Sequence, residues 1–142
     1  MLAQDLGEPG GVAALLDEIQ PELIVNAAAY TAVDAAEEHR DRAFRLNGEL
    51  PGQLAQWAAA KNAFLLHYST DYVFDGTAGT PYAEDAEPRP LNVYGRSKLA
   101  GEQAIHVPDV FKPGLIARAG AWLPGGMEFN FPVGHHIRGM RP

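Results

Sequence analysis

Residues 69–102 hold the two motifs that organise the chain, STDYVFDG at 69–76 and YGRSKLAGE at 94–102. The first motif follows the apolar run 63–68, which predicts a strand that ends near Thr70. The second motif predicts a helix from about 93 to 106. The prolines, glycines and acids between them predict a loop that lies over the end of the strand.

Tyr94 and Lys98 are four residues apart in the predicted helix, so their side chains emerge from one face about one turn apart. Tyrosine in water has a pKa of about 10, and an adjacent ammonium lowers that pKa because it favours the phenolate. A tyrosine tuned in this way exchanges a proton with a substrate oxygen. The hydroxyl of Thr70 is placed to hold the same oxygen. We therefore predict that Thr70, Tyr94 and Lys98 are catalytic.

The rest of the chain alternates between helices and strands. Helical spacing of apolar residues predicts helices at about 10–19 and 36–61, and short apolar runs predict strands at 22–26 and 114–118. The run 22–26 is typical of a strand that is buried on both faces of a parallel sheet. The predicted fold class is α/β, a partial Rossmann-like doubly wound parallel sheet with about three strands and flanking helices.

Small residues at 27–29 follow the strand 22–26, where open α/β sheets bind ligands. They either let a ligand approach the backbone or allow tight packing of the next helix. Asp34 and Glu37 either line a substrate pocket or are simply solvated. His67, which lies inside the predicted strand 63–68, is interpreted as a packed residue without a catalytic role.

Composition excludes several classes of function. The 142 residues suit one globular domain, and a net charge of −7 with eleven scattered Lys and Arg argues against a nucleic-acid partner. The chain has no cysteine, no signal peptide and no apolar run near the roughly 20 residues that cross a membrane, so we expect a cytoplasmic protein without membrane contact. His135 and His136 lack further ligands at metal-binding spacing, so no metal site is predicted.

Three motifs carry a resemblance to a known family: NAAAYTAVD at 26–34, STDYVFDG at 69–76 and PLNVYGRSKLAGE at 90–102. They resemble the short-chain dehydrogenase/reductase superfamily and, within its extended branch, the dTDP-4-dehydrorhamnose reductases, over roughly residues 5–118. The resemblance implies reduction of a nucleotide-linked 4-keto sugar, dTDP-4-dehydrorhamnose to dTDP-rhamnose, with NADPH or NADH as cofactor. It also implies a nucleotide-sugar substrate and allows a homodimer in the full-length protein.

The resemblance also assigns roles to single residues. It implies a cofactor site made of Asp5, Leu6, Ala27, Ala28, Ala29, Tyr30, Tyr94 and Lys98. It implies a substrate site made of Thr70, Asp71, Tyr72, Phe74 and Trp122. Asn47 matches an asparagine that supports the site in the family, although an asparagine satisfied at a bend near Pro51 is the alternative. Near Trp122 the chain departs from the family, because an Arg-Thr pair is replaced by a longer segment without threonine.

The glycine-rich turn that holds the cofactor pyrophosphate in the family has no counterpart before Asp5. We therefore expect residues 1–131 to form a partial NAD(P)-binding Rossmann-like domain, residues 132–142 to be an irregular tail, and the chain alone to bind dinucleotides weakly. Two alternatives to an active reductase stay open. One is a non-catalytic regulatory subunit, because the β subunit of methionine adenosyltransferase is similar to these reductases, and the other is an inactive fragment.

Overall fold

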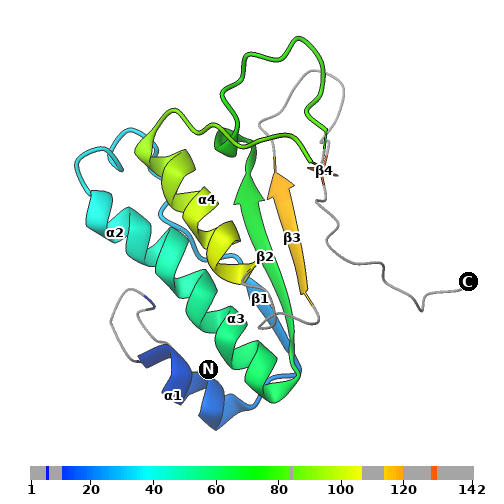
Figure 1. Cartoon of the computed structure of the whole chain (residues 1–142). Coiled ribbons are helices and arrows are strands. Elements are labelled where there is room, and N and C mark those ends of the chain that lie inside the picture. Colours follow the sequence, from blue (N-terminus) through cyan, green and yellow to red (C-terminus); the bar gives the residue numbers. More distant parts are fainter. Residues whose placement is uncertain (1–5, 7–10, 84, 107–113, 120–128, 131–142) are drawn as a thin grey trace, which may run out of the picture.

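The computed structural model describes residues 6, 11–83, 85–106, 114–119 and 129–130. Four predictions lie outside these residues: the cofactor role of Asp5, the substrate role of Trp122, the tail 132–142 and the histidine pair 135–136. Within the described residues the order of elements is helix, strand, helices, strand, helix, strand and a short last strand, as an α/β fold requires (Figure 1).

The sheet contains the three parallel strands that the sequence predicts. They are β1 (Leu23–Asn26), β2 (Phe64–Thr70) and β3 (Gly114–Ala119), and they lie in the order β1-β2-β3. A two-residue strand that was not predicted, β4 (Phe129–Asn130), pairs antiparallel with β3. In the registers, Asn26 lies opposite His67 and Thr70 opposite Ala119. The carboxyl ends of the parallel strands therefore meet at one edge of the sheet.

The described helices cover one face of this sheet. α1 (Gly11–Ile19), α3 (Leu50–Lys61) and α4 (Val93–Ile105) share one core with the strands. That core contains the residues Val12, Leu16, Ile24, Leu50, Leu54, Leu65, Ile105 and Ile116. On the other face Leu23 and Val25 are 55% and 52% exposed. The prediction that this strand is buried on both faces is therefore wrong for the described residues, which place no helix over its second face.

The expected helix 36–61 is interrupted in the structure. Residues 32–39 form hydrogen-bonded turns, and the helix begins with α2 (Arg40–Phe44), passes through the π-helical turn η1 (Arg45–Glu49) and continues as α3. Pro51 explains the wider turn, because its ring has no N–H and would crowd the carbonyl of Asn47 four residues earlier. The left-handed residue Asn62 (φ 56°) ends α3 where the sequence predicted.

α4 runs beside η1 and α3, and it also contacts β2 and the turn η2 that follows this strand (Figure 1). Two of its glycines allow this approach. A Cβ on Gly95 would meet the carbonyl of Tyr72, and a Cβ on Gly101 would meet the carbonyl of Asn47. Because neither position has room for a side chain, α4 lies against the strand ends and against η1 at once.

Candidate active site

Thr70 is the last residue of β2 and leads into the 3-10 turn η2 (Asp71–Val73). Its side chain is 5% exposed. The Thr70 hydroxyl donates to Asp71 Oδ1 at 3.2 Å and accepts from the backbone N–H of Tyr72 at 3.3 Å, as an N-cap does. Thr70 therefore lies at the strand end that the sequence predicts, with its hydroxyl held by the turn that follows.

Tyr94 lies in the first turn of α4, which is capped by two side chains. Asn92 Oδ1 accepts from the N–H of Gly95 at 2.7 Å, and Glu37 Oε1 accepts from the N–H of Val93 at 2.7 Å. Glu37 is thus a capping residue, a role that neither of the two interpretations of this acid included. The ring of Tyr94 packs edge-on against Tyr72, with 5.5 Å between the ring centroids.

The structure brings Tyr94 and Thr70 together, although a long loop separates them in the sequence. A side-chain hydrogen bond with Thr70 is among the contacts that set the pKa of Tyr94. Burial has the larger effect and raises the pKa of Tyr94 above 10, and Asp71 and Tyr72 raise it further. The expected lowering of this pKa by Lys98 is therefore wrong for the protein without ligands.

Lys98 is 2% exposed and reaches across to the sheet. Its ammonium donates to the carbonyl oxygen of Tyr68 in β2 at 2.6 Å. Burial lowers the pKa of Lys98 to about 8, while the carboxylate of Glu102 one turn later acts in the opposite direction. Lys98 therefore lies one helical turn from Tyr94, as predicted, but its charge is directed to a backbone carbonyl.

The turn after β1 is held by two buried amides. Asn26 Oδ1 accepts from the N–H of Ala28 at 3.2 Å. Asn47 is fully buried, accepts from the N–H of Tyr30 at 2.8 Å, and donates to the carbonyl of Tyr30 at 3.0 Å and to Ser97 Oγ at 2.9 Å. Asn47 therefore connects the predicted cofactor-binding turn to α4, which supports the interpretation that it organises the site.

Other predicted site residues differ in how they are placed. Leu6 and Ala28 are partly buried and pack against the core. Ala27 is exposed, whereas Ala29 is half-buried. Of these residues only Ala27 is exposed, and the side chain of Leu6 packs against the core.

The predicted substrate residues also separate into two groups. Asp71 and Tyr72 are exposed beside Thr70. Phe74 is buried, and its ring stacks on Tyr82 at 4.3 Å and lies 5.2 Å from the guanidinium of Arg118. Its contact with a substrate stays a prediction that this packing does not favour.

The loop after Phe74 has internal order that the sequence did not reveal. Asp75 Oδ1 accepts from the N–H and hydroxyl of Thr77 at 3.0 and 2.8 Å and from the hydroxyl of Tyr82 at 2.7 Å. The bonds from Thr77 and Tyr82 lower the pKa of Asp75 to about 2. Asp75 therefore stays a carboxylate at any ordinary pH and holds the base of the loop.

Four buried polar residues near the site were missed by the sequence analysis or set aside in it: His67, Ser69, Glu102 and Arg118. His67 Nδ1 lies 3.0 Å from Asn26 Nδ2. Since Asn26 accepts from Ala28 through its oxygen, the amide donates to Nδ1, and the proton of the ring lies on the buried Nε2, which has no partner among the described residues. The only sequence signal for Glu102 was its spacing of four residues from Lys98.

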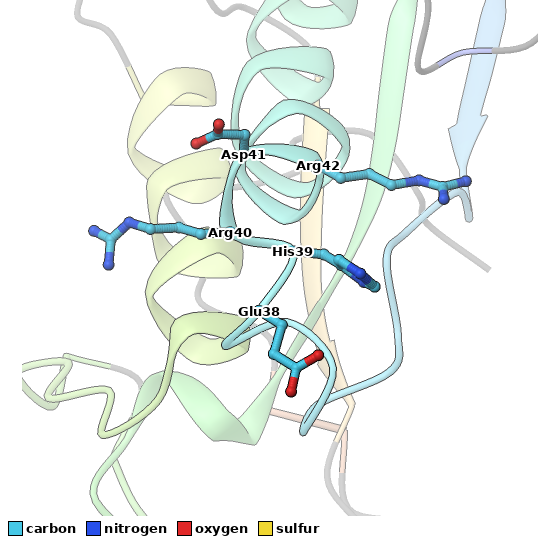
Figure 2. A pocket seen from close by; sticks show the side chains of 5 residues that line it. All are labelled: Glu38, His39, Arg40, Asp41 and Arg42. Carbon is cyan, nitrogen blue, oxygen red and sulfur yellow. The ribbon is translucent and has the colours of Figure 1, made fainter.

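A hollow of about 340 Å³ lies at the beginning of α2, apart from these residues (Figure 2). Its lining consists of the consecutive residues Glu38, His39, Arg40, Asp41 and Arg42. None of them was predicted as a site residue, and the hollow does not include the strand ends. Among the described residues no cluster of His, Asp and Glu has the geometry of a metal site, and no helix there is both long and apolar enough to cross a membrane.

A parallel α/β sheet with a threonine at a strand end and a tyrosine and lysine one turn apart beside it is the arrangement of a short-chain dehydrogenase/reductase. The model of one family, described as the RmlD substrate binding domain, matches residues 2–134. The chain therefore belongs to this family, and the resemblance that the motifs predicted is confirmed.

Curated relatives agree with this assignment. The dTDP-4-dehydrorhamnose reductase of Burkholderia thailandensis is 50% identical over 101 residues, which are 71% of this chain and 34% of that protein. The same enzyme of Salmonella typhimurium is 44% identical over 127 residues, 89% of this chain and 42% of that protein. The chain thus spans roughly two fifths of the length of these relatives.

A solved structure gives the same fold. The dTDP-4-dehydrorhamnose reductase of Bacillus anthracis, crystallised in complex with NADP, superposes with a TM-score of 0.75 at 37% identity. The match covers 82% of this chain and 41% of that chain. The prediction of a Rossmann-like α/β fold with three parallel strands is confirmed.

Proposed function

We propose that this chain carries the catalytic segment of an NADPH- or NADH-dependent reductase that converts the 4-keto group of a dTDP-linked sugar, dTDP-4-dehydrorhamnose, to an alcohol. One observation carries the proposal. The phenol of Tyr94 faces Thr70 at the carboxyl end of β2, since Thr70 is among the groups that act on the pKa of Tyr94, and Lys98 lies one turn further along the same helix. Relatives that cover most of the chain at 42–50% identity act on this class of substrate by name.

The residues at the strand ends suit a nicotinamide cofactor. The small residues 27–29 leave the backbone after β1 open to close approach, and Asn47 fixes the turn that they form. The ammonium of Lys98, once directed away from Tyr68, is the charge available to a ribose hydroxyl. Ala27, Ala28, Ala29 and Tyr30 would therefore hold the nicotinamide half, with Lys98 and Tyr94 beside it.

When bound, the reduced nicotinamide supplies the hydride that reaches the carbonyl carbon of the sugar. As the carbonyl oxygen gains negative charge, Tyr94 donates its phenolic proton to that oxygen, which becomes the hydroxyl of the product. Thr70 donates a hydrogen bond to the same oxygen and stabilises its charge. The Lys98 ammonium stabilises the tyrosinate that remains until a proton from solvent restores the phenol.

The raised pKa of Tyr94 is compatible with these roles. A phenol with a raised pKa is fully protonated at neutral pH, so the acid that the reduction needs is always present. Transfer of its proton then depends on Lys98, whose pKa of about 8 leaves it mostly protonated at neutral pH. Both groups therefore start the reduction in the required protonation states.

The test replaces the matching segment of the Salmonella typhimurium reductase by this chain and follows oxidation of NADPH and NADH with dTDP-4-dehydrorhamnose. We expect turnover that is lost on Tyr94→Phe while cofactor binding, measured by calorimetry, is retained. A folded chimera that binds cofactor but has no turnover would contradict the proposed reductase activity and favour the alternative of a non-catalytic binding subunit. A cytoplasmic location, a homodimer and the nucleotide-sugar partner are part of this proposal.

A further inference from the structure

Glu102 forms a buried cluster that the proposed reaction does not use. Its side chain is 5% exposed and lies one turn after Lys98 on α4. Glu102 Oε1 accepts from the hydroxyl of Ser69 and from Arg118 Nε at 2.9 Å, and Oε2 accepts from Arg118 Nη2 at 2.6 Å. We call Glu102, Ser69 and Arg118 the carboxylate clasp.

The clasp joins two neighbouring strands of the sheet to the helix that packs beside the site. Ser69 belongs to β2, Arg118 to β3, and these two residues lie opposite each other in the parallel register. Glu102 belongs to α4. The bidentate geometry of the arginine fixes the direction of the carboxylate as well as its distance. The clasp therefore sets where α4 lies over this pair of strands.

Stability alone does not explain the clasp. Desolvation of two charges offsets much of their attraction, and apolar residues of similar volume often hold a core as well. A buried ion pair with three hydrogen bonds does specify one arrangement of the elements that it joins. Here those elements are the ones that carry Thr70, Tyr94 and Lys98.

The neighbours of the clasp connect it directly to the site. Ser69 immediately precedes Thr70, and Glu102, Lys98 and Tyr94 are spaced by four residues along one face of α4. The guanidinium of Arg118 also lies 5.2 Å from the ring of Phe74, in the segment that follows Thr70. A shift of Glu102 would therefore move Tyr94 and Lys98 relative to Thr70.

We propose that Glu102 is a positioning residue for the reductase site: through Ser69 and Arg118 it holds Tyr94 against Thr70, and it places a carboxylate one turn from Lys98 on the same helix. The role in catalysis rests on the proposed function. The position and charge of Lys98 can be measured without turnover. Failure of the proposed function and failure of this positioning role therefore give different experimental results.

The titratable groups that face Lys98 are few among the described residues. The neutral His67 faces it from β2 and the carboxylate of Glu102 from α4, while the carbonyl of Tyr68 accepts a hydrogen bond from its ammonium. Burial lowers the pKa of Lys98, and Glu102 acts against that effect. Removal of the negative charge should therefore let the pKa of Lys98 fall further, without any change in burial.

The test titrates Lys98 in the chain by NMR of the lysine Cε and Nζ atoms, with Lys98→Met to assign its signal among the three lysines. We expect Glu102→Gln to lower the titration midpoint of Lys98 by about one pH unit, as a neighbouring charge in a partly screened site would. Glu87→Gln is the matched control, since it makes the same change in an exposed ion pair with Arg89. An unchanged midpoint in folded Glu102→Gln would overturn the proposal.

Positioning has a separate readout, the NOE contacts between the ring of Tyr94 and the side chain of Thr70. We expect them to weaken in Glu102→Gln and in Ser69→Ala, and to persist in Glu87→Gln. Ser69→Ala keeps both charges, so its Lys98 midpoint should stay near that of the parent chain. If Glu102→Gln does not fold, the NOE contacts of Ser69→Ala provide the test instead. Full retention of the Tyr94–Thr70 contacts in Ser69→Ala would then overturn the proposal.

Discussion

The ammonium of Lys98 donates to the carbonyl oxygen of Tyr68 at 2.6 Å, so that a helix residue and a strand residue are joined across the core of the site. This contact explains why Lys98 does not act on the phenol of Tyr94 in the protein without ligands. A ligand that binds the ammonium of Lys98 must therefore take the place of the carbonyl oxygen of Tyr68 as its hydrogen-bond acceptor. The lysine is thus held in place beside the site before any cofactor binds.

Tyr94→Phe should remove most of the turnover of the chimera described above. The substitution removes the phenolic hydroxyl and keeps the ring, and loss of a general acid typically costs about 10²–10⁴-fold in kcat. Cofactor affinity should change little, because the ring and its packing against Tyr72 are kept. Tyr68→Phe is the matched control, since the side chain of Tyr68 is 40% exposed and only its backbone contacts Lys98. Equal loss of turnover in both variants would refute the role of Tyr94.

Lys98→Met should stabilise the fold while it abolishes turnover. The pKa of Lys98 is about 8 in the folded chain, whereas its ordinary value of 10.5 applies to the unfolded chain. Between pH 8 and pH 10.5 the unfolded chain therefore binds more protons than the folded chain. The stability that the neutral amine provides is present above 10.5 and is lost as the pH falls through 8. At about pH 7 the variant should gain about 1–3 kcal/mol in free energy of unfolding.

Urea unfolding at neutral and at alkaline pH measures this effect. The gain from Lys98→Met should shrink as the pH rises, whereas Lys61→Met, at an exposed lysine, should show no such trend. A constant difference between parent and variant at all pH values would mean that burial of the charge is not its cause.

The sequence predicted the elements near the site better than their surroundings. The helix that carries Tyr94 and Lys98 was predicted at about 93–106 and spans Val93–Ile105, because a helix-forming sequence is a local signal; its cap by Asn92 was not predicted. The start of the preceding helix was missed, since turns at 32–39 contain helix-forming alanines. The sequence offered a bend near Pro51 as one alternative for Asn47, but it did not predict that the helix widens into the π-helical turn η1 there.

Other misses have causes outside local sequence. The apolar run of β1 does not tell whether one face or two are covered, so the exposure of Leu23 and Val25 was not predictable. Glu102 had no role in the sequence analysis beyond its place in a motif, because only the fold brings Ser69 and Arg118 to it. The raised pKa of Tyr94 likewise follows from burial.

Gly95→Ala should disturb the site through backbone contact alone. The added Cβ would meet the carbonyl of Tyr72, which belongs to η2 and has little freedom to move. We expect a loss of about 1–3 kcal/mol in stability, as for other overpacked positions, together with weaker Tyr94–Thr70 contacts. Gly79→Ala is the control, since nothing lies within 4 Å of its added Cβ. The two are compared by thermal unfolding and NOE spectra, and equal stability of both variants would refute the close approach.

His67 should make the chain sensitive to mild acid. Burial and, to a smaller extent, the charge of Lys98 together lower the pKa of His67 to about 3, whereas its ordinary pKa is 6.5. Below pH 6.5 this histidine therefore binds a proton in the unfolded chain, whereas in the folded chain it does so only below about pH 3. The stability that neutral His67 provides is complete above 6.5 and is lost as the pH falls towards 3, by about 1.4 kcal/mol per pH unit.

Urea unfolding between about pH 7 and 5 isolates this histidine, because most carboxylates titrate at lower pH. We expect His67→Gln to flatten the dependence of the free energy of unfolding on pH in this range, even if the variant is less stable at neutral pH. His106→Gln, at an exposed histidine, should leave the slope as it is in the parent chain. If the slope is the same in all three proteins, the buried imidazole of His67 does not cause it, and the neutral, uncharged state assigned to that ring is wrong.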